Sequence, residues 1–255
     1  MAITIKNPNE ISKMRDAGHV VSVCHQQVEA AIAPGVTTGD LDEIVRDVIA
    51  GMGATSNFYG HHGFPGYICA SVNDEIVHGI PGERRLESGD IISVDIGAIV
   101  DGFHGDSAWT YAVGDVSDET QRLLRDTEDA LYAGISAALA GRRIGAIGSA
   151  VESVARPLGY GIVEGYGGHG IGRQMWEEPH IPNLGSPDSG PRMRPGMTLA
   201  IEPMLNLGDH ETKVLADNWT VVTADCSRSA HFEHTVVITD GEPEILTRRL
   251  AAVVE

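Results

Sequence analysis

The sequence predicts a single α+β domain in which the strands lie inside and the helices cover them. The main support is an order of two helices followed by strands, which occurs twice along the 255 residues. The hydrophobic content of 42% also provides for a substantial core. No linker or low-complexity segment divides the chain, so we expect one domain over 1–255. Its two pseudo-symmetric halves, about 1–114 and 115–255, suggest an internal duplication.

The first half opens with two helices. Asn7 can cap the first helix, Pro8 fits its first position, and Glu10 lies three residues after the cap, as in a capping box. A second helix begins near Thr38, carries an apolar stripe at helical spacing and ends at Gly51. Strands are then expected over 67–72, 91–98 and 105–113.

The second half repeats this order. Ser117 caps a helix that extends to about Leu139, with Asp118 and Glu119 in its first turn. A shorter helix is expected near 147–155, and strands are expected over 161–164, 198–204 and 231–239.

The charge and the cysteines limit the classes of function. The formal net charge is −18 and the isoelectric point about 4.9, with no run of Lys or Arg. Nucleic-acid binding and stable attachment to a membrane surface both need a basic face, so both are excluded. Cys24, Cys69 and Cys226 lack the spacing of a disulfide framework, and neither a signal peptide nor a long apolar span is evident. The expected compartment is the reducing cytoplasm.

The segment 91–113 predicts a hairpin with two carboxylates on one face. Asp101-Gly102 is a strong signal for a two-residue turn, and pairing outward from it sets Asp106 opposite Gly97. Asp95 shares a face with Gly97, so the two carboxylates are diagonal neighbours, about 7–8 Å apart at the backbone. Among apolar residues they would repel each other and be poorly solvated, and a cation between them would relieve both problems. Gly97 would leave room for this ion; the alternative is that the Asp residues lie at solvated strand ends.

Three further segments place an acid or an imidazole in an apolar or glycine-rich setting: Glu202 in 200–204, Glu233 in 231–235 and His169 in 167–172. Taken singly each has a simpler explanation, such as a loop histidine. With Asp95 and Asp106 they offer four carboxylates and one imidazole, which suits two Mn, Fe, Co or Zn ions better than one structural zinc.

Two dications would balance the charge of those four carboxylates. Water that bridges the two ions should ionise near neutral pH and become a nucleophile. His78, in the segment 73–79, is the leading candidate to hold a substrate amide or an oxyanion, with a surface-loop histidine as the alternative.

Five motifs then occur in order and at characteristic spacing: SVNDEIVHGIP, VDIGAIVDGFHGDSAWT, GGHGIG, AIEPM and FEHTVVIT. In these motifs the sequence resembles the type I methionine aminopeptidases of the bacterial short form, over nearly the whole chain. The resemblance implies the duplicated pita-bread fold. It also implies a cytoplasmic enzyme that uses two divalent ions, Co, Mn, Fe or Zn, to remove the N-terminal methionine of nascent polypeptides, with a preference for a small second residue.

The resemblance also implies roles for individual residues. The implied metal ligands are Asp95, Asp106, His169, Glu202 and Glu233. Asp106 and Glu233 would bridge both ions, Glu202 would double as general base or proton shuttle, and His78 would contact the scissile amide. The implied substrate-binding residues are His78, Phe58, His61, His62, Phe64, Cys69, Met175, Trp176 and Trp219.

The substrate pocket departs from the pattern that is usual in this family. Members usually carry a second histidine seven residues after the metal-binding one, where this chain has Trp176. Met175 stands where an aromatic residue is common, His61 and Phe64 where tyrosines are common, and Phe58 where a cysteine is common. All five implied metal ligands are present, but the substrate pocket is altered. The catalytic rate and the selectivity for methionine are therefore the properties expected to differ from those of the family.

Other functions fit less well. Aminopeptidase P and prolidase, proline-specific relatives on the same fold, usually carry a large extra N-terminal domain, whereas the first helix here begins by residue 8. A binding protein that had lost catalysis would be expected to lack a metal ligand, and all five are present. A monomer that contacts the ribosome transiently, and binds neither nucleic acid nor a membrane, is the expected form.

Overall fold

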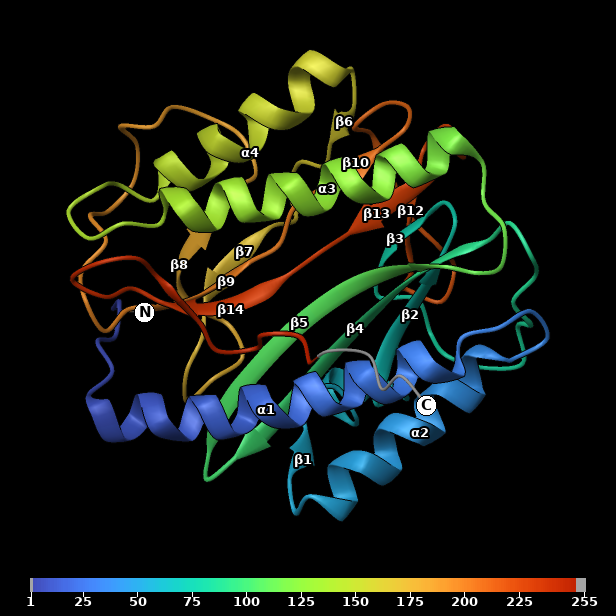
Figure 1. Cartoon of the computed structure of the whole chain (residues 1–255), viewed down its shortest axis with the longest axis horizontal. Coiled ribbons are helices and arrows are strands. Elements are labelled where there is room, and N and C mark those ends of the chain that lie inside the picture. The colour runs from blue at the N-terminus through green and yellow to red at the C-terminus, as the bar shows by residue number, and fades with distance from the viewer. Residues whose placement is uncertain (1, 251–255) are drawn as a thin grey trace.

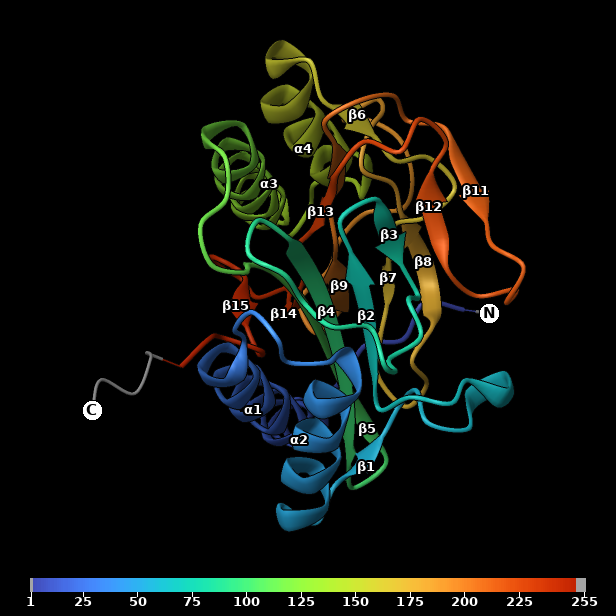
Figure 2. The same ribbon diagram turned by 90° about the vertical axis from the view of Figure 1, so that its right-hand side faces the viewer.

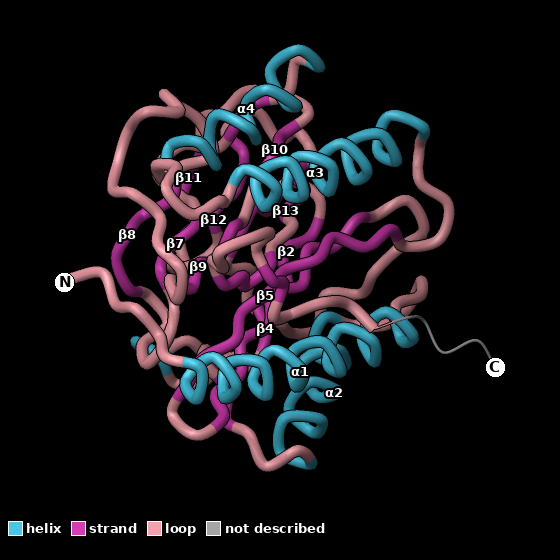
Figure 3. The backbone as a smooth tube through the Cα atoms, turned by 60° about the vertical axis from the view of Figure 1, so that its left-hand side comes forward, coloured by secondary structure: helices cyan, strands magenta, loops and turns pink. Residues whose placement is uncertain are grey.

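The structure, a computed structural model, describes residues 2–250 and confirms the mixed arrangement of strands inside and helices outside. Residue 1 and residues 251–255, which complete the predicted domain, lie outside the described residues. Helices α1 (Pro8–Ala31) and α2 (Thr38–Gly51) lie on one side of the strands, and α3 (Asp118–Ala137) and α4 (Gly145–Leu158) lie on the other (Figure 1). Figure 3 shows the strands as a central layer between the two helix pairs.

The first three helices begin where the sequence predicts, and α4 begins at Gly145, slightly before its expected start. The Asn7 side chain accepts hydrogen bonds at the start of α1, and the Glu10 side chain accepts one from the Asn7 N–H, which completes a capping box. Thr37 and Asp40 form the same box on α2, and Ser117 caps α3. These caps satisfy N–H groups that the first turn of a helix leaves unpaired.

The described strands form four sheets. The first contains β1 (Thr55–Ser56), β4 (Ile91–Val100) and β2 (Ile68–Val72), with β5 (Phe103–Ala112) paired to β4. The largest has the order β15 (Glu244–Ile245), β14 (His234–Val237), β9 (Thr198–Ile201), β7 (Gly168–Gly170) and β8 (Glu177–Ile181).

Two three-stranded sheets complete the set. One has the order β13 (Ser229–His231), β10 (Met204–Asn206) and β6 (Gly161–Ile162). The other has the order β11 (Thr212–Val214), β12 (Val221–Thr223) and β3 (Glu75–Val77). Figure 2 shows β11 and β12 at the rim of the molecule, on the side away from α1 and α2. A short 3₁₀ helix, His61–Gly63, lies between β1 and β2.

The predicted β4–β5 hairpin is confirmed in its register. Gly97 pairs with Asp106, and the turn residues Asp101 and Gly102 have φ values of 50° and 75°. Positive φ at both central positions is what a type I′ turn requires. The register places Asp95 and Asp106 on the same face of the hairpin, as the sequence predicts.

The strands predicted over 198–204 and 231–239 are wrong as continuous elements, because each is broken in two. β9 ends at Ile201 and β10 begins at Met204, while β13 ends at His231 and β14 begins at His234. Ile201 pairs with His234 and Met204 pairs with His231, so the two breaks lie opposite each other. At these breaks both segments cross between the five-stranded sheet, which contains β9 and β14, and the three-stranded sheet that contains β10 and β13.

Backbone hydrogen bonds explain the break. The Phe232 N–H donates to the Pro203 carbonyl at 3.2 Å, and the Glu233 N–H donates to the Ala108 carbonyl of β5 at 2.8 Å. Pro203 has no N–H to offer a neighbouring strand. The regular pairing between the two segments is therefore interrupted at 202–203 and 232–233. Glu233 is turned toward the hairpin.

Each helix pair has its own hydrophobic core. Residues such as Leu41 and Val94 pack with α1 and α2, and residues such as Ile147 and Leu199 pack with α3 and α4. Trp109 on β5 packs against both cores. Within residues 2–250, none of the helices combines the length and the apolar character needed to cross a bilayer.

Candidate active site

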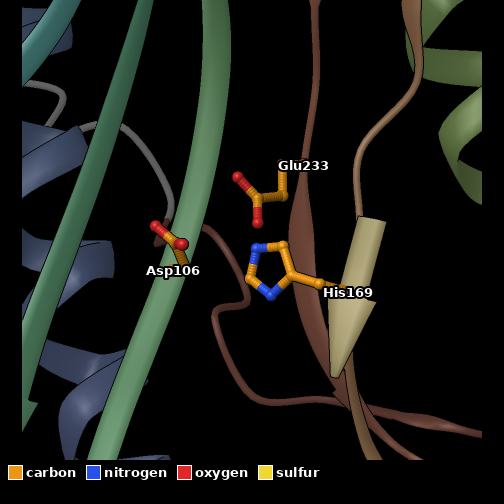
Figure 4. A group of neighbouring side chains, drawn as sticks. All are labelled: Asp106, His169 and Glu233. Carbon is orange, nitrogen blue, oxygen red and sulfur yellow. The ribbon is translucent and has the colours of Figure 1, made fainter. Parts of the chain in front are cut away.

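Three of the predicted metal ligands meet at one point in the interior. Asp106, His169 and Glu233 are buried, and one ligand atom from each lies within 4.8 Å of the others. Figure 4 shows these side chains directed toward one another from β5, from β7 and from the segment before β14. Asp95 and Glu202 line the same cavity, which has a volume of about 430 Å³.

Hydroxyl groups and backbone groups hold the hairpin against the segment that carries Glu233. The Asp106 N–H donates to Thr235 Oγ1 at 3.1 Å, and the same hydroxyl donates to the Asp106 carbonyl at 2.8 Å. The Ser107 hydroxyl donates to the Glu233 carbonyl at 2.6 Å. These bonds fix the distance between carboxylates that come from different sheets.

The buried carboxylates suit a cation. Asp95 Oδ1, Asp106 Oδ1 and Glu233 Oε1 are buried and have no hydrogen-bond partner among residues 2–250. Burial raises the pKa of all three acids, and neighbouring carboxylates raise the pKa of Asp106 and Glu233 further. Unpaired buried oxygens at such a density are costly, and divalent ions would satisfy them. The residues present therefore fit the implied metal centre.

Glu202 differs from the other three acids because imidazoles surround it. His169 Nε2 lies 3.6 Å from Glu202 Oε1, and His231 Nε2 lies 3.5 Å from Glu202 Oε2. Burial acts to raise the pKa of Glu202, but the interactions with His231, His169 and His78 outweigh it and lower that pKa. Glu202 is thus the acid of the set most readily ionised.

The prediction that Gly97 leaves room for an ion is wrong. A Cβ added at Gly97 would overlap the side chain of Asn57, which is buried and fills that space. The Asn57 amide donates to the Gly105 carbonyl at 3.4 Å. Because glycine has no side chain, position 97 leaves space for the Asn57 side chain beside β4 and β5.

The other end of the cavity is apolar. A buried cluster there consists of Phe58, Phe64, Cys69 and Met175, with Trp219 packed against it. The Phe64 ring lies 5.1 Å from the Trp219 ring, edge to face. Cys69 pairs with Asp95 across β2 and β4, which sets the apolar cluster directly beside the carboxylates.

Two of the predicted substrate-binding residues lie at the junction of the apolar and ionisable parts. His78 is half-buried, and its ring lies 6.5 Å from that of Trp219. Its backbone has a φ of 61°, which is uncommon for histidine, and strain of this kind gathers at functional sites. Trp176 also lines the cavity, but its side chain is 45% exposed and its ring lies 4.8 Å from that of His61.

His62 is the predicted site residue that the structure does not bring to the cavity. It is exposed, it contacts the His61 ring, and the cavity wall formed by the described residues does not include it. His61 itself lines the cavity.

Several polar residues that line the cavity were missed from the sequence, namely Tyr166, Glu177, Glu178, His180 and His231. His231 is 2% exposed and lines the cavity beside Glu202. It stands two positions before Glu233 in a segment that reads as a strand, so the alternation of side chains would have placed both on one face. Asn57 had no such signal. It directly follows β1 and lies beside Gly97, and it is not among the described residues that line the cavity.

Comparison with known proteins identifies the family of the chain. Residues 12–240 match metallopeptidase family M24. Methionine aminopeptidase 1 of Bacillus subtilis is 50% identical over 246 residues, which cover 96% of the chain and 99% of that protein. Methionine aminopeptidase 1 of Mycobacterium tuberculosis is 49% identical over 249 residues, which cover 95% of the chain and 94% of that protein.

A solved structure agrees with these relatives. The crystal structure of methionine aminopeptidase from Thermotoga maritima matches with a TM-score of 0.96 at 42% identity, and the match covers 97% of this chain and 100% of that one. The predicted family resemblance, pita-bread fold and enzyme class are therefore confirmed. The chain belongs to metallopeptidase family M24 and, within it, to the methionine aminopeptidases.

Proposed function

We propose that this chain hydrolyses the first peptide bond of polypeptides that begin with methionine, and that it prefers a small second residue. The observation that carries this proposal is the junction of two environments in one cavity. Asp95, Asp106, His169, Glu202 and Glu233 line one part, and the apolar cluster of Phe58, Phe64, Cys69, Met175 and Trp219 forms the other. A methionine side chain in the apolar part would set its peptide bond beside the ionisable part.

The metal cofactors are proposed as two divalent ions. Asp95, Asp106, His169, Glu202 and Glu233 would hold these ions, and Asp106 and Glu233 would be the ligands shared between them. Bound ions in such a site act as Lewis acids and lower the pKa of water to near neutrality. These ligands would accept Mn, Fe, Co or Zn, and metal availability would decide between them.

The remaining chemistry falls to the chain's own side chains. Glu202 directly follows β9 and has a lowered pKa, so its carboxylate can accept a proton from water and pass it to the leaving amine. His78 can donate an N–H to the scissile amide. The Phe64 and Trp219 rings would hold an unbranched methionine side chain and exclude water.

A matrix of metals and substrates tests this proposal. The substrates are Met-Gly, Met-Ala, Leu-Gly and X-Pro peptides, and the metals are Mn²⁺, Fe²⁺, Co²⁺ and Zn²⁺. We expect Met-Gly and Met-Ala to be cleaved faster than Leu-Gly or X-Pro with every metal that activates. Faster cleavage of the X-Pro peptides would favour the proline-specific alternative. A metal titration of the chelator-treated protein should give two ions per chain.

We also propose a cytoplasmic monomer that meets nascent chains through transient contact with the ribosome. Cys24, Cys69 and Cys226 are free thiols in the structure, as expected in a reducing compartment. Light scattering would measure the oligomeric state, and co-sedimentation with ribosomes would test the contact.

A further inference from the structure

His231 lines the cavity beside Glu202, and neither the sequence motifs nor the proposed ligand set gives it a role. It lies at the end of β13, and its side chain is 2% exposed. Its Nε2 is buried, has no hydrogen-bond partner within the described chain, and lies 3.5 Å from Glu202 Oε2. A nitrogen buried beside a carboxylate oxygen is well placed to restrain it.

The backbone of His231 is fixed from two sides. The His231 N–H donates to Thr110 Oγ1 at 2.8 Å, and the same hydroxyl donates to the His231 carbonyl at 2.8 Å. On the other side His231 pairs with Met204 of β10, two residues after Glu202. The strand that carries the imidazole is therefore held by Thr110 on one side and by Met204 on the other, beside Glu202.

The two imidazoles beside Glu202 face different oxygens. His169 Nε2 lies 3.6 Å from Oε1, whereas His231 Nε2 lies 3.5 Å from Oε2. Only His169 belongs to the group whose ligand atoms converge with those of Asp106 and Glu233. Oε1 is thus the oxygen on the metal side, and Oε2 is left for a donor.

Charge balance in the metal-loaded site leaves room for a hydrogen-bond donor at this position. With metal bound, Asp95, Asp106, Glu202 and Glu233 would carry four negative charges, which two dications would balance, so the site would need no further cation. A neutral imidazole with its proton on Nε2 can donate one hydrogen bond and leaves that balance unchanged.

We infer that His231 is a positioning residue: its Nε2–H holds Glu202 Oε2, which leaves Oε1 free for metal and fixes the carboxylate for proton transfer. This inference rests on the proposed function for the identity of the reaction, but not for the contact. Partners of this kind orient the ligands of metal sites, and their loss typically costs about 10–100-fold in metal affinity or activity.

The test compares substitutions that differ in reach. The His231→Gln amide can extend about as far as the imidazole and donate an N–H to Oε2, whereas the His231→Asn amide is too short to do so. His231→Leu fills the space without a donor. Each full-length variant is freed of metal with a chelator and titrated with Co²⁺ by calorimetry. The visible absorption of bound Co²⁺ is recorded, kcat and KM are measured on a Met-Ala peptide, and thermal unfolding checks the fold.

We expect His231→Asn and His231→Leu to lose about 10–100-fold in Co²⁺ affinity or in kcat, with KM little changed. His231→Gln should recover most of the loss and keep the wild-type Co²⁺ spectrum. The inference is overturned if His231→Asn behaves as the wild type. This variant also decides the outcome if His231→Leu fails to fold. The inference is also overturned if His231→Gln loses one ion and changes the spectrum, because His231 is then a ligand. A wild-type protein that binds Co²⁺ but cleaves no methionine peptide would remove the proposed function, and the affinity series would still decide the role of His231.

Discussion

Trp176 lies at the mouth of the cavity, with its ring 4.8 Å from that of His61 and 6.4 Å from that of His169. Family members usually carry a histidine at this position, which can donate a hydrogen bond to a substrate carbonyl or an oxyanion. The indole has one N–H as well, but on a larger and mostly apolar ring that cannot become a cation. At the scale of single residues this is the change with the most direct effect on rate.

Trp176→His should raise kcat on a Met-Ala peptide with little change in KM. Loss of one transition-state donor costs up to about 2.7–4 kcal/mol, or 10²–10³ in rate. The gain should be smaller, because His78 and the bound metal ions are proposed to act on the same group. An unchanged or lower kcat/KM would mean that the pocket has been rebuilt around the tryptophan.

Asp106→Asn should abolish nearly all activity and lower the metal content, because a neutral amide cannot bridge two dications. Elemental analysis and the peptide assay check both effects. The matched control is Asp101→Asn, since Asp101 is exposed and an Asn-Gly pair suits the same hairpin turn. Wild-type activity and metal content in Asp106→Asn would show that the ligand assignment is wrong.

At the scale of elements, β7 shows why the glycines beside His169 matter. A Cβ added at Gly168 would overlap the carbonyl of Ala200 on β9, the strand to which β7 pairs. Gly168→Ala should therefore cost about 1–3 kcal/mol of stability, as overpacking does, and should weaken metal binding by displacing His169. Urea unfolding and a metal titration measure the two effects.

Gly51→Ala is the matched control for this change. No other residue of the described chain lies close to a Cβ at Gly51, which ends α2. Alanine there should be neutral or stabilising by up to about 1 kcal/mol. Equal effects of the two substitutions would refute the argument from close packing.

The sequence predicted the elements whose causes are local. The capping box at Asn7 and the turn at Asp101-Gly102 each depend on neighbouring residues, so α1 and the β4–β5 register were both predicted correctly. The breaks at Glu202 and Glu233 depend on hydrogen bonds to residues far along the chain, such as the bond from Glu233 to Ala108. The alternation of apolar and polar residues along a strand carries no information on such partners. Pro203 was the one local sign of a break, because proline is rare inside a paired strand.

The candidate site divides in the same way. The ligand set was recognised from short motifs, and the Asp95–Asp106 pair followed from the hairpin register. The filling of space beside Gly97 by Asn57, and the approach of His231 to Glu202, arise from packing between distant segments. No spacing rule in the sequence fixes such contacts, and the division into two halves likewise stays a prediction.

At the scale of the whole molecule, the buried carboxylates should make stability depend on pH when metal is absent. Burial raises the folded-state pKa of Asp106 well above the ordinary value, with neighbouring carboxylates adding to the effect. Such a group stabilises the fold fully below its unfolded-state pKa of about 4 and loses that contribution as pH rises through the folded-state pKa. The Asp106→Asn variant has no ionisable group at this position, so it does not lose stability in this way as pH rises.

The metal-free Asp106→Asn variant should therefore become more stable relative to the metal-free wild type as pH rises from about 5 to about 8. Buried His25 and His234, whose pKa is lowered to about 3, destabilise the fold at low pH, but both proteins contain them and their effect cancels. Urea unfolding of both proteins across this range gives the difference. A difference that stays constant or falls with pH would contradict the proposed environment of Asp106.

The proposed metal ligands come from parts of the chain that are made at very different times. Asp95 and Asp106 belong to one hairpin, whereas Glu233 comes more than a hundred residues later and contacts that hairpin at Ser107 and Ala108. Contacts between such distant positions form late, because the loop between them must close first. A copy still under synthesis thus has an incomplete site however well its first half has folded. The proposed site therefore becomes complete only after Glu233 has been synthesised and has joined the hairpin.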